Sequence, residues 1–131
     1  MQNRRARMKQ LPLVLGLIAV ALFATVLSVG CGGGGGGGNS FTVKGTDYKF
    51  DPADITVQSG QKVTVTLQNN GSVAHNWTVL DLDGKDVGTG DVEPRQKKSV
   101  EFTATKAGTY TIECTVPGHA DAGMKGTLTV R

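Results

Sequence analysis

Four side chains in this sequence have the types and spacing that bind a soft transition metal. Cys114, His119 and Met124 share one short segment with the pattern C-x4-H-x4-M, and His75 lies 39 residues before the cysteine. Two imidazoles, a thiolate and a thioether predict a trigonal site of two nitrogens and one sulfur with a weak axial sulfur, which suits one copper ion. Cu(I) favours soft sulfur and Cu(II) favours nitrogen, so a fixed intermediate site lets the ion change charge with little movement. This chemistry is the transfer of one electron at a time.

Each of these residues has a simpler interpretation when it is taken alone. A single histidine is usually an ordinary core or surface residue, and a single methionine is usually packing. Cys114 could fill space in a core or form a disulfide with Cys31. Beyond Cys31, however, the chain has only two histidines, one cysteine and one methionine, and all four belong to the pattern. The joint spacing therefore favours the metal site over separate structural roles.

The elements that must position these residues are β-strands, because apolar residues recur with a period of two beyond residue 41. Val63, Val65 and Leu67 alternate with polar residues, and the same alternation recurs in short segments separated by turn signals such as Asp51-Pro52 and Ala107-Gly108. Seven or eight short strands in residues 41–131 predict an all-β domain of two packed antiparallel sheets.

Strand parity predicts that the ligands from different segments meet. His75 shares its face with Trp77 and Val79, and Cys114 shares its face with Ile112. Successive side chains of a strand point to opposite faces, so an imidazole and a thiol are aimed into the same end of the core.

The first forty residues predict export and attachment to a membrane. Residues 1–30 combine a basic start with an apolar run, as signal peptides do. The segment Leu27–Cys31 resembles a bacterial lipobox, which makes Cys31 the candidate lipid attachment site, and the glycine-rich residues 31–40 are predicted to be a flexible tether. The alternative is an uncleaved transmembrane helix, since 19 mostly apolar residues could just span a bilayer. Arg4-Arg5 also gives a weak indication of twin-arginine export.

The charge distribution excludes nucleic acid as a partner. The net charge of +3 comes from four basic residues at the N-terminus, and beyond residue 31 there are 10 Lys and Arg against 11 Asp and Glu. The predicted domain thus carries a net charge of −1 and no basic stripe. We expect it on the extracytoplasmic face of a bacterial membrane.

Three segments resemble the cupredoxins, the plastocyanin and azurin superfamily: His75-Asn76-Trp77, Gly108-Thr109-Tyr110 and residues 113–130. The C-x4-H-x4-M spacing is most similar to that of the auracyanins. The resemblance covers about residues 41–131 and implies a Greek-key β-sandwich, with His75, Cys114, His119 and Met124 as ligands of one copper ion. It also implies that Asn76 ties the two ligand-bearing segments together by hydrogen bonds.

The same resemblance implies a monomeric electron carrier that exchanges electrons with protein partners, such as membrane electron-transfer complexes or cytochromes. An enzyme of the copper nitrite reductase or multicopper oxidase type is not expected, because a second copper would need histidines that the chain lacks. A copper carrier or scavenger for oxidase assembly is the remaining alternative.

Overall fold

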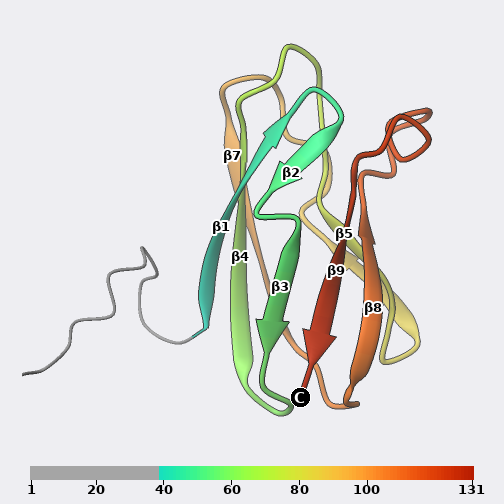
Figure 1. Ribbon diagram of the computed structural model, residues 1–131. Helices are drawn as coiled ribbons and strands as arrows, with labels where there is room; N and C mark the ends of the chain where they lie inside the picture. Colours follow the sequence, from blue (N-terminus) through green and yellow to red (C-terminus); the bar gives the residue numbers. More distant parts are fainter. Residues whose placement is uncertain (1–38) are drawn as a thin grey trace, which may run out of the picture. The chain divides into compact units, whose positions relative to one another are not determined.

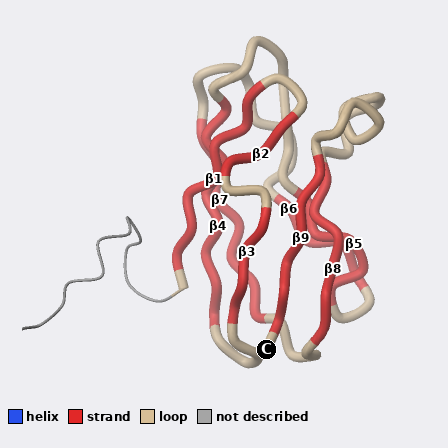
Figure 2. The backbone as a smooth tube through the Cα atoms, viewed as in Figure 1, coloured by secondary structure: helices blue, strands red, loops and turns tan. Residues whose placement is uncertain are grey.

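The computed structural model describes residues 39–131, which consist of strands, turns and loops (Figure 2). The strands are β1 (Ser40–Thr46), β2 (Lys49–Asp51), β3 (Asp54–Val57), β4 (Lys62–Asn69), β5 (Thr78–Leu82), β6 (Lys85–Gly88), β7 (Lys97–Thr103), β8 (Gly108–Glu113) and β9 (Lys125–Val130). They confirm the all-β domain predicted from the period-two pattern. The signal segment, Cys31 and most of the tether lie outside the described residues. Ser40, predicted as the last residue of the tether, is instead the first residue of β1, where it pairs with Thr64 of β4.

Two sheets make up the domain (Figure 1). One has the order β2-β1-β4-β7 and the other the order β3-β9-β8-β5-β6. The chain passes repeatedly from one sheet to the other, so neighbours in space are often distant in sequence. The two-sheet sandwich is therefore as predicted.

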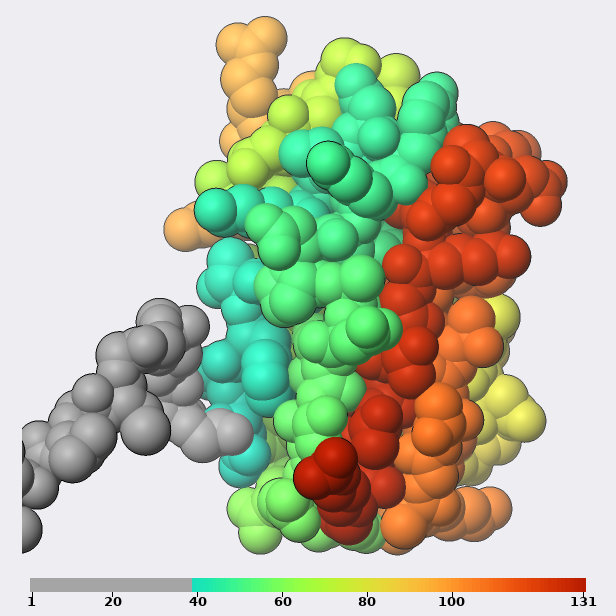
Figure 3. All heavy atoms as spheres, viewed as in Figure 1, coloured from blue at the N-terminus to red at the C-terminus, as the bar shows by residue number. Residues whose placement is uncertain are grey.

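The prediction of purely antiparallel sheets needs a correction, because each sheet contains one parallel pair. Strand β1 runs parallel to β4. Strand β3 runs parallel to β9, and the two lie side by side on the face drawn in Figure 3. The physical reason is the crossing between sheets: each of these pairs is joined through strands of the other layer, which lets the chain return in the same direction. Period-two alternation reports which face is buried but not the direction of a partner strand.

The core lies between the sheets and follows the predicted alternation. In β4, Val63, Val65 and Leu67 are fully buried, and they form one apolar cluster with Ile112 and Leu128 of the other sheet. Aromatic side chains add to it, since the only tryptophan stacks on a phenylalanine of β7 with ring centroids 6.2 Å apart. Aromatic and aliphatic burial of this kind is the main stabilising term for a small domain.

The strand containing His75 differs from the prediction. Strand β5 begins at Thr78, and His75 instead forms an isolated antiparallel bridge with Val92 through two backbone hydrogen bonds of 3.1 and 2.8 Å. His75, Trp77 and Val79 are nevertheless all fully buried, as parity predicted. Strand β6 was not expected, because its sequence Lys-Asp-Val-Gly has a single large apolar residue.

Within residues 39–131, no helix is long and apolar enough to cross a membrane.

Candidate metal centre

Three connections meet at one end of the sandwich (Figure 1). They are the turn between β1 and β2, the loop that follows β4, and the loop between β8 and β9, which holds residues 114–124. The loop after β4 brings His75, and the last loop brings the cysteine, the second histidine and the methionine. The sheets thus hold two segments that are distant in sequence against each other.

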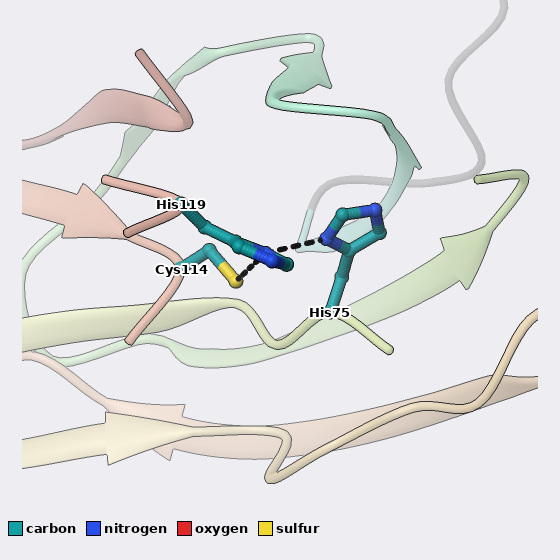
Figure 4. Close-up of side chains that lie close together, drawn as sticks. All are labelled: His75, Cys114 and His119. Carbon is teal, nitrogen blue, oxygen red and sulfur yellow. Dashed lines mark hydrogen bonds between the residues drawn. The ribbon is translucent and has the colours of Figure 1, made fainter. Parts of the chain in front are cut away.

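The structure brings His75, Cys114 and His119 together (Figure 4). One ligand atom from each residue lies within 4.8 Å of the others, and all three residues are buried. Nδ1 of His119 lies 3.0 Å from Nδ1 of His75 and 3.4 Å from Sγ of Cys114. Two ring nitrogens and a sulfur therefore converge on one point.

Met124 closes the loop that carries the other ligands. Its backbone N–H donates to the carbonyl of His119 at 3.0 Å, and its carbonyl accepts from the N–H of Cys114 at 3.1 Å. Its side chain is fully buried. A Cβ placed on Gly45 would lie 3.4 Å from Cε of Met124 and 3.9 Å from Cβ of His75, so both residues border Gly45 of β1.

Asn76 joins the two ligand-bearing segments. Its side-chain oxygen accepts a hydrogen bond from the backbone N–H of Thr115 at 2.9 Å, and its amide nitrogen donates to Oγ1 of Thr115 at 3.0 Å. The backbone N–H of Asn76 also points at Sγ of Cys114, 3.4 Å away. Because Asn76 follows His75 and Thr115 follows Cys114, these bonds fix the distance between the two ligands.

The sequence analysis did not single out Asn69, although it organises the loop that carries His75. Its side chain is fully buried, donates to the carbonyls of Val73 and Val92 at 2.8 and 2.7 Å, and accepts from the N–H of Gly71 at 2.9 Å. A buried amide that satisfies three backbone groups is costly to replace. The run Asn69-Asn70-Gly71 signals a turn, but nothing in it marks one amide as buried.

The turn between β1 and β2 also escaped the sequence analysis. Tyr48, at a positive φ of 67°, places its ring edge-to-face with His119 at a centroid distance of 5.2 Å. The preceding residue, Asp47, lies 3.5 Å from Nε2 of His75. The turn between β1 and β2 thus contacts both histidines. These contacts join segments that are distant in the sequence, and the alternation pattern of a single strand does not reveal them.

Burial controls the protonation of His75. Loss of solvent is the largest effect and lowers the pKa of the His75 imidazole. Asp47 acts in the opposite direction and raises this pKa, whereas the nearby His119 lowers it further. A neutral imidazole is the form that binds a metal ion. Hydrogen bonds from the backbone and hydroxyl of Ser72 lower the pKa of Asp47, which keeps that carboxyl ionised.

The donor set fits a single copper ion. The three converging atoms are two imidazole nitrogens and the sulfur of Cys114, a free thiol that is fully buried, and Met124 of the same loop supplies a buried thioether. Hard cations need oxygen donors, and the cluster contains no carboxylate. Thiolate and imidazole suit both zinc and copper, and two imidazoles and one thiolate with a weak axial thioether are the donor set of copper electron-transfer sites.

A family model described as a cupredoxin-like domain matches residues 16–130. The chain belongs to this family. The expected similarity to the auracyanins is also confirmed, because this chain is 32% identical to auracyanin-A of Chloroflexus aurantiacus over 114 residues. That match covers 66% of this chain and 70% of the relative. Family and donor set together identify one copper ion as the cofactor of this cupredoxin.

Similar proteins also include a copper-resistant cuproprotein and a plastocyanin. The cupredoxin is 30% identical to the copper-resistant cuproprotein CopI of Rubrivivax gelatinosus over 99 residues, which cover 63% of this chain. It spans 60% of the length of that relative and 54% of the length of a rice plastocyanin that is 36% identical to it.

Solved structures agree on the fold. The auracyanin of Roseiflexus castenholzii, crystallised in a dithionite-reduced form, matches with a TM-score of 0.65 and 25% identity over 73% of this chain and 99% of that one. Auracyanin A of Chloroflexus aurantiacus, a blue copper protein, gives a TM-score of 0.63 and 28% identity over 72% of this chain and 100% of that one. The cupredoxin-like sandwich is therefore shown by sequence and structure together.

We predict that Asn76→Ala lowers the free energy of unfolding by about 1–3 kcal/mol, because it leaves the backbone N–H of Thr115 without its partner. Urea denaturation of the metal-free protein measures the change. Asn70→Ala is the matched control, since Asn70 is exposed, and it should change stability by less than about 0.5 kcal/mol. Equal losses in the two variants would show that the link to Thr115 does not hold the segments together.

Proposed function

We propose that this cupredoxin is a type 1 copper protein that carries one electron at a time between protein partners outside the cytoplasm. His75, Cys114 and His119 are its strong ligands, and Met124 is the weak axial ligand. The observation that carries the proposal is the buried convergence of the three strong donors within 4.8 Å. The copper ion, when bound, supplies the Cu(I)/Cu(II) couple.

The surrounding chain keeps these donors in place whatever the charge at the centre. The backbone bridge of His75 with Val92, the Asn76–Thr115 hydrogen bonds and the bonds that close the 114–124 loop restrict the ligand segments. A site that does not rearrange is suited to rapid electron exchange, because little reorganisation is needed.

The surface over the site supports His119 as the route by which electrons enter and leave. His119 is 8% exposed, whereas His75, Cys114 and Met124 are 0% exposed. Tyr48 contacts the His119 ring and is one of two exposed large apolar residues among residues 39–131, at 45% exposure. A small apolar surface around one ligand suits the brief, weak encounters of redox proteins.

A second candidate function is copper binding for resistance or delivery, and the similarity to CopI favours it. The two functions differ in how readily the metal leaves. A carrier of electrons retains copper through many redox cycles, whereas a carrier of copper transfers it to a competing chelator. The burial of all three strong donors favours retention.

We also propose that the protein is held on the outer side of a bacterial membrane through a lipid on Cys31, with residues 32–39 as the tether before β1. Support comes from the lipobox-like segment before Cys31 and from the glycine run after it. Two or more acyl chains give stable anchoring, whereas one chain binds only marginally.

The type 1 site predicts opposite effects for two substitutions of Met124. Met124→Leu removes a donor that stabilises Cu(II) more than Cu(I) and should raise the reduction potential, whereas Met124→Gln supplies a harder oxygen and should lower it. Both variants should still bind copper. Cys114→Ser should lose the intense visible absorption, which depends on the thiolate. Voltammetry and visible spectroscopy test the set, and shifts of the same sign in both Met124 variants would exclude the axial role.

Electron exchange through His119 predicts that a charge beside it slows the reaction. Ala120→Glu should reduce the bimolecular rate with a redox partner and leave the copper spectrum unchanged. Gln58→Glu adds the same charge on an exposed turn outside the ligand loops and is the control. Stopped-flow kinetics measure both rates. A wild-type rate for Ala120→Glu would place the route of the electron elsewhere.

Lipid attachment predicts that Cys31→Ser blocks lipidation and leaves copper binding unchanged. Mass spectrometry of the native protein should find a chain that begins at a modified Cys31. An unmodified Cys31, or a chain that begins elsewhere, would refute the anchor.

A further inference from the structure

Two hydrogen bonds hold Asp47 at the edge of the metal centre. It lies in the turn between β1 and β2, and both of its carboxylate oxygens accept hydrogen bonds from Ser72. The backbone N–H of Ser72 donates to Oδ1 and its hydroxyl donates to Oδ2, each at 3.0 Å. The carboxylate therefore connects the β1–β2 turn to the loop that carries His75.

The ring of His75 presents its second nitrogen to this carboxylate. Nδ1 faces His119 on the side of the converging donors, so Nε2 lies on the other side of the ring (Figure 4). Nε2 is buried and has no hydrogen-bond partner among the described residues, and it lies 3.5 Å from Oδ1 of Asp47. When Nδ1 binds a metal ion, Nε2 carries the proton of the neutral ring and needs an acceptor.

Gly71 makes this approach possible. A Cβ at Gly71 would lie 2.6 Å from Oδ1 of Asp47 and 2.7 Å from Nε2 of His75, closer than real Cβ atoms come to other groups. Any other residue at this position would push the carboxylate and the imidazole apart. The absence of a side chain at Gly71 therefore matches the need for a close contact between the other two residues.

We propose that Asp47 is a positioning residue for His75: its carboxylate accepts the Nε2–H of the ring, fixes which nitrogen faces the metal, and stabilises Cu(II) relative to Cu(I) through its negative charge. The inference rests on the proposed type 1 copper site. Metal-binding histidines commonly have a carboxylate or carbonyl on their outer nitrogen, which raises the donor strength of the ring. The Asp47 side chain is 46% exposed, so water moderates the effect of its charge.

The alternative role for Asp47 is only to cap the turn at Ser72. The two roles differ in what they predict for the isosteric variant Asp47→Asn. The amide oxygen of this variant can still accept bonds from Ser72 and from Nε2–H, but the negative charge is gone. A cap alone predicts an unchanged reduction potential, whereas a positioning charge predicts a higher one.

We expect Asp47→Asn to shift the equilibrium toward Cu(I) by about three- to tenfold, which is about 28 to 59 mV at 59 mV per tenfold for a one-electron couple. Glu101→Gln is the matched control, because it also removes one negative charge. Glu101 forms an exposed ion pair with Lys62, which begins β4, whereas the metal-centre loop follows the other end of that strand. Its potential should stay near that of the wild type. Equal potentials in Asp47→Asn and the wild type would overturn the proposal.

Asp47→Ala separates the hydrogen bond from the charge. In the diamagnetic Cu(I) protein, the Nε2–H proton of His75 should be visible by NMR and exchange slowly in the wild type and in Asp47→Asn. It should exchange at least about tenfold faster in Asp47→Ala, where the acceptor is missing. Equal exchange in all three proteins would refute Asp47 as the acceptor. A copper-loaded wild type without intense thiolate absorption would instead refute the type 1 site itself, so the two failures are distinguishable.

Discussion

The hydrogen bonds between Asn76 and Thr115 are the interaction on which the metal centre depends. They join the residue after the first histidine to the residue after the cysteine, at 2.9 and 3.0 Å. Ligands from two segments can hold a metal in one geometry only if the segments themselves cannot separate. The backbone N–H of Asn76, 3.4 Å from the cysteine sulfur, adds a third contact across the same junction.

The sandwich makes that junction rigid. His75 is bridged to Val92, and Asn69 also holds the same loop through the carbonyls of Val73 and Val92. The ends of the 114–124 loop are held together by the pairing of β8 with β9. The hydrogen bond from the N–H of Cys114 to the carbonyl of Met124 extends this pairing into the loop. Since buried polar networks are stable only when every member is satisfied, these bonds restrict the ligand loops to one arrangement. Among the described residues, two buried side-chain nitrogens lack a partner, Nε1 of Trp77 and the outer nitrogen of His75, and Asp47 is the nearby acceptor for the histidine.

Most of the fold and the ligand set could be predicted from the sequence because they depend on local patterns. Alternation identified the buried face of β4, parity placed His75 and Cys114 in the same core, and the C-x4-H-x4-M spacing identified one loop. The parallel pairs β1–β4 and β3–β9 could not be predicted, because strand direction depends on connections through the other sheet. The contacts of Asp47 and Tyr48 with the histidines also depend on long-range pairing, which leaves no local signature in the sequence.

The central claim is that the chain fixes the ligands in one arrangement that serves both oxidation states. X-ray absorption spectroscopy of the copper-loaded protein tests this most directly, in the Cu(II) and the Cu(I) forms. The account predicts two nitrogen ligands and one short sulfur ligand in both forms, with little change in bond length between them. Loss of an imidazole on reduction, or a spectrum with no short copper–sulfur distance, would contradict it.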